Sequence, residues 1–109
     1  SLGSRGLGDV YKRQVVDQVN THLIIQTENL IEKGVNRSQI AVDPGLGFGK
    51  KMEDSKELFF NLHNLINTYP IVVGYSRKKF TDQLNMTNNE MIDHCLDSGV
   101  DLLRLHLDN

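Results

Sequence analysis

The chain has 109 residues, with 12 Lys plus Arg against 14 Asp plus Glu. This near-neutral balance excludes a general nucleic-acid binder, which needs surplus basic side chains to displace counterions from phosphates. With 39% hydrophobic residues and no apolar run near the roughly 18 to 20 residues of a membrane span, we expect a soluble globular chain without a membrane partner. The single cysteine, Cys95, excludes an internal disulfide and favours a reducing compartment, most simply the cytoplasm.

Residues 1–14 differ in composition from the rest of the chain. They hold glycines and basic residues with no sustained apolar period, so we exclude them from fold reasoning. The segment resembles translated library-adapter or vector sequence, and we interpret it as a non-native extension joined at about Gln14 to a partial domain over residues 15–109. The upstream genomic sequence tests this interpretation.

The next 60 residues predict two helices and two strands. From Val15 onward apolar residues recur at three- and four-residue spacings until Gly34, which predicts a helix with a left-handed C-cap. The short apolar run 40–42 predicts a buried parallel strand. A second helix is expected over about 54–68, followed by a strand over 71–74.

The last 35 residues complete an alternating order. A broken helical region is expected over about 80–84 and 90–97, with Gly99 as its C-cap and a third strand over about 102–105. Strands that recur about every 30 residues are typical of βαβ units, so we predict an α/β fold with a parallel sheet covered by helices. The loops after the strands then share one end, where ligands bind in such folds.

The loop from Asp43 to Lys50 follows the first predicted strand and has glycine at three alternate positions. Glycines let the backbone approach a ligand, and a carboxylate at a strand end can accept two hydrogen bonds from a flat nitrogen heterocycle. The spacing fits neither a dinucleotide fingerprint nor a P-loop. A flexible turn in which Asp43 caps a helix is an equally good interpretation of the loop taken alone.

Two basic groups follow the later strands. Arg77 and Lys78 could bind a carboxylate, polarise a ring carbonyl or stabilise developing negative charge, although a solvated cationic turn is the usual alternative. Arg104 and His106 share one face of the last strand by its two-residue period, and together they suit a phosphate or pyrophosphate. The alternative there is a surface ion pair beside a frayed terminal histidine.

We interpret several other carboxylates, sulfur-containing residues and histidines as structural rather than catalytic or metal-binding. We expect helix-dipole compensation from the carboxylates and packing from the sulfur-containing residues. We also expect surface or structural histidines, with no protein metal site among them. The carboxylates are Glu53, Asp54 and Glu57; the packing residues are Met86, Met91 and Cys95; the histidines are His22, His63 and His94.

Three motifs in order resemble the C-terminal part of dihydropteroate synthase, a pterin-binding family. They are the runs 40–50 (IAVDPGLGFGK), 70–78 (PIVVGYSRK) and 99–106 (GVDLLRLH), and the resemblance covers about residues 15–108. It implies the C-terminal parallel strands and covering helices of a partial (β/α)8 TIM barrel. The family condenses 4-aminobenzoate with 6-hydroxymethyl-7,8-dihydropterin diphosphate in folate biosynthesis and releases pyrophosphate with Mg²⁺ assistance.

The resemblance implies roles for individual residues. Asp43 would hydrogen-bond the amino-pyrimidine edge of the pterin, and Lys78 would contact the pterin beside the aminobenzoate pocket; these two are the expected catalytic residues. Arg104 and His106 would hold the departing diphosphate. The aminobenzoate pocket would be formed by Phe48, Ser76 and Arg77.

The resemblance also implies what lies outside this chain. The family's N-terminal strands have no counterpart here, so a protein ligand for Mg²⁺ is not expected in these residues, and the whole protein is expected to be a homodimer. Leu107 and Lys79 depart from the family's usual residues, and the segment 79–99 is shorter than usual. We expect the chain alone to be inactive; the alternatives are a non-catalytic pterin- or anion-binding remnant and a pterin-dependent methyltransferase domain.

Overall fold

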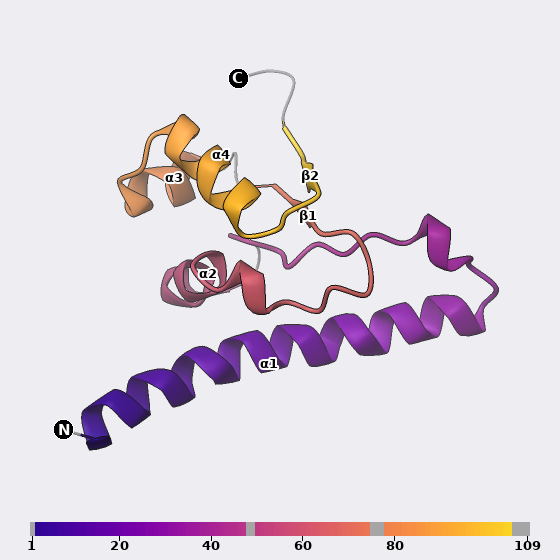
Figure 1. The fold of residues 1–109 in the computed structure, drawn as a ribbon, viewed down its shortest axis with the longest axis horizontal. Helices are drawn as coiled ribbons and strands as arrows, with labels where there is room; N and C mark the ends of the chain where they lie inside the picture. Colours follow the sequence, from indigo (N-terminus) through magenta and orange to yellow (C-terminus); the bar gives the residue numbers. More distant parts are fainter. Residues whose placement is uncertain (1, 48–49, 75–77, 106–109) are drawn as a thin grey trace.

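The computed structural model describes residues 2–47, 50–74 and 78–105 (Figure 1). The elements follow the predicted chain order, except that the first predicted strand, 40–42, is reduced to a single bridge residue, Val42. The helices are α1 (Leu2–Glu32), α2 (Met52–Phe59), α3 (Lys78–Leu84) and α4 (Asn88–Asp97); the strands are β1 (Val72–Val73) and β2 (Leu102–Leu103); the short 3-10 helices are Arg37–Gln39 and Leu62–Asn64. Among the described residues, no helix combines the length and apolar character that a membrane crossing requires.

The sheet has two parallel strands, and an isolated parallel bridge adds a third short segment beside it. β1 pairs with β2 in the register Val72 to Leu102 and Val73 to Leu103. On the other side of β1, Val42 forms a parallel bridge with Ile71. The Val42 N–H donates to Pro70 O at 2.8 Å, and the Val72 N–H donates to Val42 O at 2.8 Å. The predicted parallel order is therefore confirmed, although each pairing is shorter than the apolar run that carries it.

Helix α1 is longer than expected. We predicted a start near Val15, but the helix is continuous from Leu2, so it includes most of the segment that we had set aside. The first 43 residues contain no proline, and without a proline nothing in this stretch forces the helix to break. Residues 1–14 have no sustained apolar period, so the pattern used to place the helix start did not predict this extension. The proposed non-native origin of residues 1–14 stays a prediction.

Helix α1 ends as predicted. Gly34 has φ of +95°, and its N–H donates to Ile31 O at 3.0 Å. The next amide, of Val35, donates to Leu30 O at 3.0 Å. These two bonds make a Schellman motif, which satisfies the last carbonyls of the helix and needs a residue that tolerates positive φ.

Helix α2 is shorter than expected, because it ends at Phe59 and not near residue 68. The Asn61 side-chain amide donates to Glu57 O at 2.7 Å, and the Asn61 backbone leaves helical geometry at φ of −127°. An asparagine that bonds the backbone four residues earlier competes with the helical ladder. The apolar spacing nevertheless continues through the 3-10 turn, and Leu62 and Leu65 are buried.

The broken helical region is confirmed as α3 and α4, which are separated by Asn85 at φ of +52°. Thr87 caps α4: its Oγ1 accepts from the Glu90 N–H at 3.1 Å, and the Glu90 carboxylate accepts from the Thr87 N–H at 2.8 Å. The hydrogen bonds from the Thr87 backbone and side chain lower the pKa of Glu90. Gly99, at φ of +88°, ends this region as expected.

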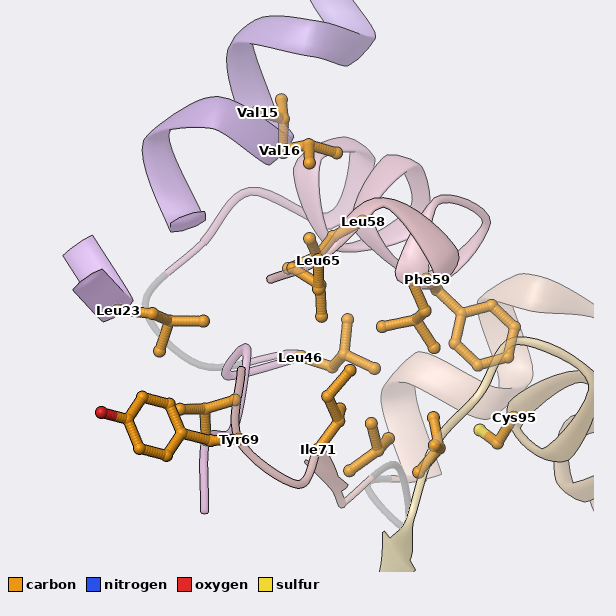
Figure 2. Close-up of a cluster of buried hydrophobic side chains, with 14 of the residues drawn as sticks. Val15, Val16, Leu23, Leu46, Leu58, Phe59, Leu65, Tyr69, Ile71 and Cys95 are labelled. Carbon is orange, nitrogen blue, oxygen red and sulfur yellow. The ribbon is translucent and has the colours of Figure 1, made fainter. Parts of the chain in front are cut away.

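The core lies between the helices and one side of the sheet. In Figure 1, α2 lies between α1 and the α3–α4 pair. Figure 2 shows side chains from α1, α2 and the strands pointing toward one another, with Leu46 of the glycine loop in the middle. Seventeen apolar residues are buried here, among them Val16, Leu23, Leu46, Leu58, Phe59, Ile71, Val73, Phe80, Met91 and Cys95.

The aromatic centre of the core includes His94, which confirms its structural role. Its Nε2–H donates to Phe59 O at 2.6 Å, and its ring centroid lies 4.4 Å from that of Phe59. Phe80 contacts the same phenylalanine edge to face at 5.7 Å. Met91 and Cys95 are fully buried nearby, as predicted for packing residues, and burial raises the pKa of the Cys95 thiol to about 11.

The two sides of the sheet differ. Val42, Ile71 and Val73 point into the core, where each is at most 5% exposed, and we call this side the covered face. The alternate residues lie on the other side, the open face, because successive strand residues point to opposite sides. The open face consists of Ala41, Asp43, Val72, Gly74, Leu102 and Arg104.

Candidate functional site

Asp43 is held at the end of the first parallel segment by its own loop. Its Oδ1 accepts a hydrogen bond from the Gly45 N–H at 2.8 Å, which is the geometry of an Asx turn. The carboxylate does not cap α2, whose N-cap is Lys51, so the helix-cap interpretation is wrong. The second oxygen, Oδ2, lies 4.0 Å from Nη2 of Arg104.

The glycine loop is fixed by hydrogen bonds across it. Gly45 and Gly47 adopt φ of +75° and +77°, which side chains rarely allow. The Gly47 N–H donates to Oγ of Ser55, a fully buried residue of α2, at 3.0 Å. The Lys50 ammonium donates to Gly45 O at 3.2 Å. These bonds tie the described part of the loop to the helix that follows and hold the Asp43 end of the loop in place.

Arg104 reaches the same point from the other edge of the sheet. Its N–H donates to Val73 O at 2.9 Å directly after β2. Its Nη2 lies 4.0 Å from Asp43 Oδ2, and the two side chains are 48% and 40% exposed. At this distance and exposure the pair contributes little to stability, so both charges remain usable for binding. Sequence reasoning put these residues at one end of the sheet, and the structure brings them together.

The other predicted site residues have different outcomes. Lys78 is the first residue of α3, the helix that follows β1 in the chain. Phe48, Ser76, Arg77 and His106 lie outside the described residues, so their predicted roles stay predictions.

A cavity of about 370 Å³ lies beside Asp43, between the glycine loop and α1. Three polar residues of α1 line it at four-residue spacing, Gln18, His22 and Gln26, which places them on one helix face. We had predicted His22 as a surface or structural residue, and it is exposed. Sequence reasoning did not assign the glutamines to the site, although their spacing was the available signal.

The described part of the chain offers no evident metal centre. Within it, no three His, Cys, Asp or Glu side chains lie together so as to hold an ion. Glu53 and Asp54 stand in the first turn of α2, where carboxylates complement the helix dipole.

The profile of the family described as "Pterin binding enzyme" matches residues 5–106. The chain belongs to this family. The dihydropteroate synthase of Staphylococcus haemolyticus is 33% identical over 79 residues, which are 71% of this chain and 30% of that protein. The dihydropteroate synthase of Mycobacterium leprae is 36% identical over 73 residues, 66% of this chain and 26% of its own length. The chain thus spans about 30% of the curated family members that it matches.

Solved structures of the family share the fold. Dihydropteroate synthase from Xanthomonas albilineans in complex with 7,8-dihydropteroate is 26% identical, with a TM-score of 0.66 over 83% of this chain and 39% of that one. The Plasmodium falciparum HPPK-DHPS with STZ-DHP is 28% identical, with a TM-score of 0.71 over 84% of this chain and 19% of its own. This family member's fold is therefore the predicted partial barrel.

Proposed function

We propose that this chain is the C-terminal part of a dihydropteroate synthase, and that the whole protein condenses 4-aminobenzoate with (7,8-dihydropterin-6-yl)methyl diphosphate. The observation that carries the proposal is the convergence of Asp43 and Arg104. A fixed carboxylate and a guanidinium lie 4.0 Å apart on the open face, at the carboxyl ends of parallel segments. This is the end of a (β/α)8 barrel where ligands bind.

The two charges suit the two ends of the pterin substrate. A carboxylate accepts paired hydrogen bonds from the amino-pyrimidine edge of a pterin, and we assign this role to Asp43, whose oxygens each have further acceptor capacity beside the Gly45 N–H and Arg104 contacts. The guanidinium of Arg104 offers a planar donor fork that matches diphosphate oxygens. With Asp43 on the pterin edge, we assign the diphosphate to the Arg104 guanidinium that lies beside it.

The chemistry requires stabilisation of a leaving group. The bond from the pterin methylene carbon to the diphosphate oxygen breaks and its electron pair leaves with pyrophosphate, and the amine nitrogen then forms a bond to that carbon. The nitrogen then loses a proton to solvent. Donors aimed at the departing oxygens lower the barrier, which is the role we assign to Arg104 and His106. Lys78 contacts the pterin beside the amine, and Phe48, Ser76 and Arg77 form the aminobenzoate pocket.

Further proposals concern the metal ion and the assembly of the whole protein. The family resemblance implies Mg²⁺ with a protein ligand outside this chain, and we derive no step through that ion. A homodimer in the cytoplasm is the state we propose for the whole protein. Light scattering during size-exclusion chromatography tests the dimer.

The deciding experiment measures dihydropteroate formation by the 109-residue chain and by the product of the complete coding sequence. We expect turnover only from the complete protein, because the open face of the chain alone leaves the ligands in water. Turnover by the short chain would contradict the proposal. Pterin binding without turnover by the complete protein would favour the non-catalytic remnant, and methyl transfer to an acceptor would favour the methyltransferase.

A further inference from the structure

Gly74 follows β1 on the open face, in the middle of the sheet. A Cβ at this position would overlap Nη2 of Arg104 and would lie only 2.7 Å from its Cζ and 3.1 Å from its Nε. Non-bonded heavy atoms do not approach so closely, so the guanidinium fills the volume that any side chain at this position would need. All three of the nearest atoms belong to Arg104.

The backbone gives no other reason for a glycine here. Four described glycines have positive φ, namely Gly34, Gly45, Gly47 and Gly99, and Gly74 is not among them. Alanine could therefore adopt the Gly74 backbone without strain. A methyl group at this position would therefore displace the Arg104 guanidinium, the far end of a flexible side chain that lies against Gly74.

The path of Arg104 explains why this space matters. Its backbone is fixed to β1 by the bond from its N–H to Val73 O at 2.9 Å. From that anchor the side chain crosses the end of β1 and comes within 4.0 Å of Asp43, which follows the segment on the far side of the sheet. The shortest route between the two outer segments passes over residue 74.

We propose that Gly74 is a positioning residue, whose missing side chain lets the Arg104 guanidinium lie across the end of β1 beside Asp43. This inference rests on the proposed function, because it assigns the guanidinium so placed to the diphosphate of the pterin substrate. A larger residue at position 74 turns the guanidinium away from Asp43, while both charges remain in the chain. Glycine at this position thus sets the distance between the two ligand-binding groups.

A double-mutant cycle on the full 109-residue chain tests the proposal. Gly74→Ala, Arg104→Ala and the double variant are compared by calorimetric titration with inorganic pyrophosphate and by urea unfolding. We expect Gly74→Ala to weaken pyrophosphate binding about tenfold in the wild-type background and less than about twofold when Arg104 is alanine. The double variant should fold, because the nearest atoms to the new methyl group are then gone.

A conservative variant separates positioning from a general structural effect. In the Arg104→Lys background the planar fork is replaced by a slender chain with a point charge, so Gly74→Ala should weaken binding about threefold or less. If Gly74→Ala reduced pyrophosphate affinity equally in the wild-type, Arg104→Ala and Arg104→Lys backgrounds, the proposal would be overturned. The glycine would then act by leaving room for the ligand or by supporting the strand end, and not through Arg104.

The two proposals fail differently. If the wild-type chain does not bind pyrophosphate, the unfolding data still report whether Gly74→Ala and Arg104→Ala are coupled. Coupling without binding supports the positioning role and counts against the assignment of the guanidinium to a diphosphate. Binding without coupling overturns the positioning role and leaves the proposed function standing.

Discussion

The covered face and the open face of the sheet belong to the same three segments, yet they differ in exposure and in charge. Val73 on the covered face is fully buried, whereas Leu102 on the open face is 57% exposed although its strand pairs with β1. The covered face is apolar throughout, and the open face carries the charges of Asp43 and Arg104.

Along each segment, alternate residues therefore serve fold stability and ligand binding. Because successive strand residues point to opposite sides, a residue that stabilises the fold is followed by one that is free to bind. Val42 packs into the core and its neighbour Asp43 faces the ligand side; Val73 is buried and Gly74 lies under Arg104. Substitutions on the two faces should therefore separate stability from binding.

The largest expected effect is on the core behind the covered face. Phe59→Ala should reduce the free energy of unfolding by about 3 to 5 kcal/mol, because Phe59 is fully buried against Phe80 and His94. The adjacent Phe60 is 45% exposed, so Phe60→Ala is a matched control with an expected loss below about 1.5 kcal/mol. Urea unfolding measures both, and equal losses would break the distinction between buried and exposed positions.

The next effect concerns the open face. In the complete protein, Asp43→Ala and Lys78→Ala should lower the rate of dihydropteroate formation by about 100-fold or more, because each removes a group that acts on the pterin. Asp93→Asn, an exposed position on α4, is the control and should leave the rate near wild type. A near-wild-type rate for either site variant would remove that residue from the site.

The third effect is a stability loss at alkaline pH. Burial raises the pKa of the Cys95 thiol from 9.0 to about 11, so the unfolded state releases this proton first as the pH rises. The protonated Cys95 thiol contributes on the order of 2 kcal/mol to the free energy of unfolding. This contribution is fully present below pH 9 and is lost between pH 9 and 11. Between pH 9 and 11, the free energy of unfolding measured with urea should fall more steeply with pH for wild type than for Cys95→Ala. Parallel pH dependences would contradict this prediction.

The smallest effect lies at the start of α4. Thr87→Ala should reduce the free energy of unfolding by about 1 kcal/mol, whereas Thr87→Ser, which keeps the accepting oxygen, should lose less. The hydrogen bonds from Thr87 lower the pKa of Glu90, so the stability due to Glu90 is present above pH 4.5 and is lost as the pH falls through its lower folded value. The stability difference between wild type and Glu90→Gln should shrink accordingly in acid, as thermal unfolding at several pH values would show.

Sequence reasoning predicted the features that depend on local pattern. The helix ends at Gly34 and Gly99 were predicted because positive φ at a C-cap strongly favours glycine. The end of α2 was missed because an asparagine bond to the backbone, and not the apolar spacing, stops that helix. The role of Gly74 was out of reach, because it depends on a side chain 30 residues later that crosses from a neighbouring strand.

The hydrogen bonds of the sheet also predict an alternating pattern of amide hydrogen exchange. The amides of Val42, Val72 and Arg104 donate to carbonyl oxygens within the sheet, whereas those of Ala41 and Asp43 have no partner among the described residues. Exchange should therefore be slow at residue 42 and fast at 41 and 43, a two-residue rhythm along a single segment. In the complete barrel a further strand would pair with that edge, and the fast positions would become slow.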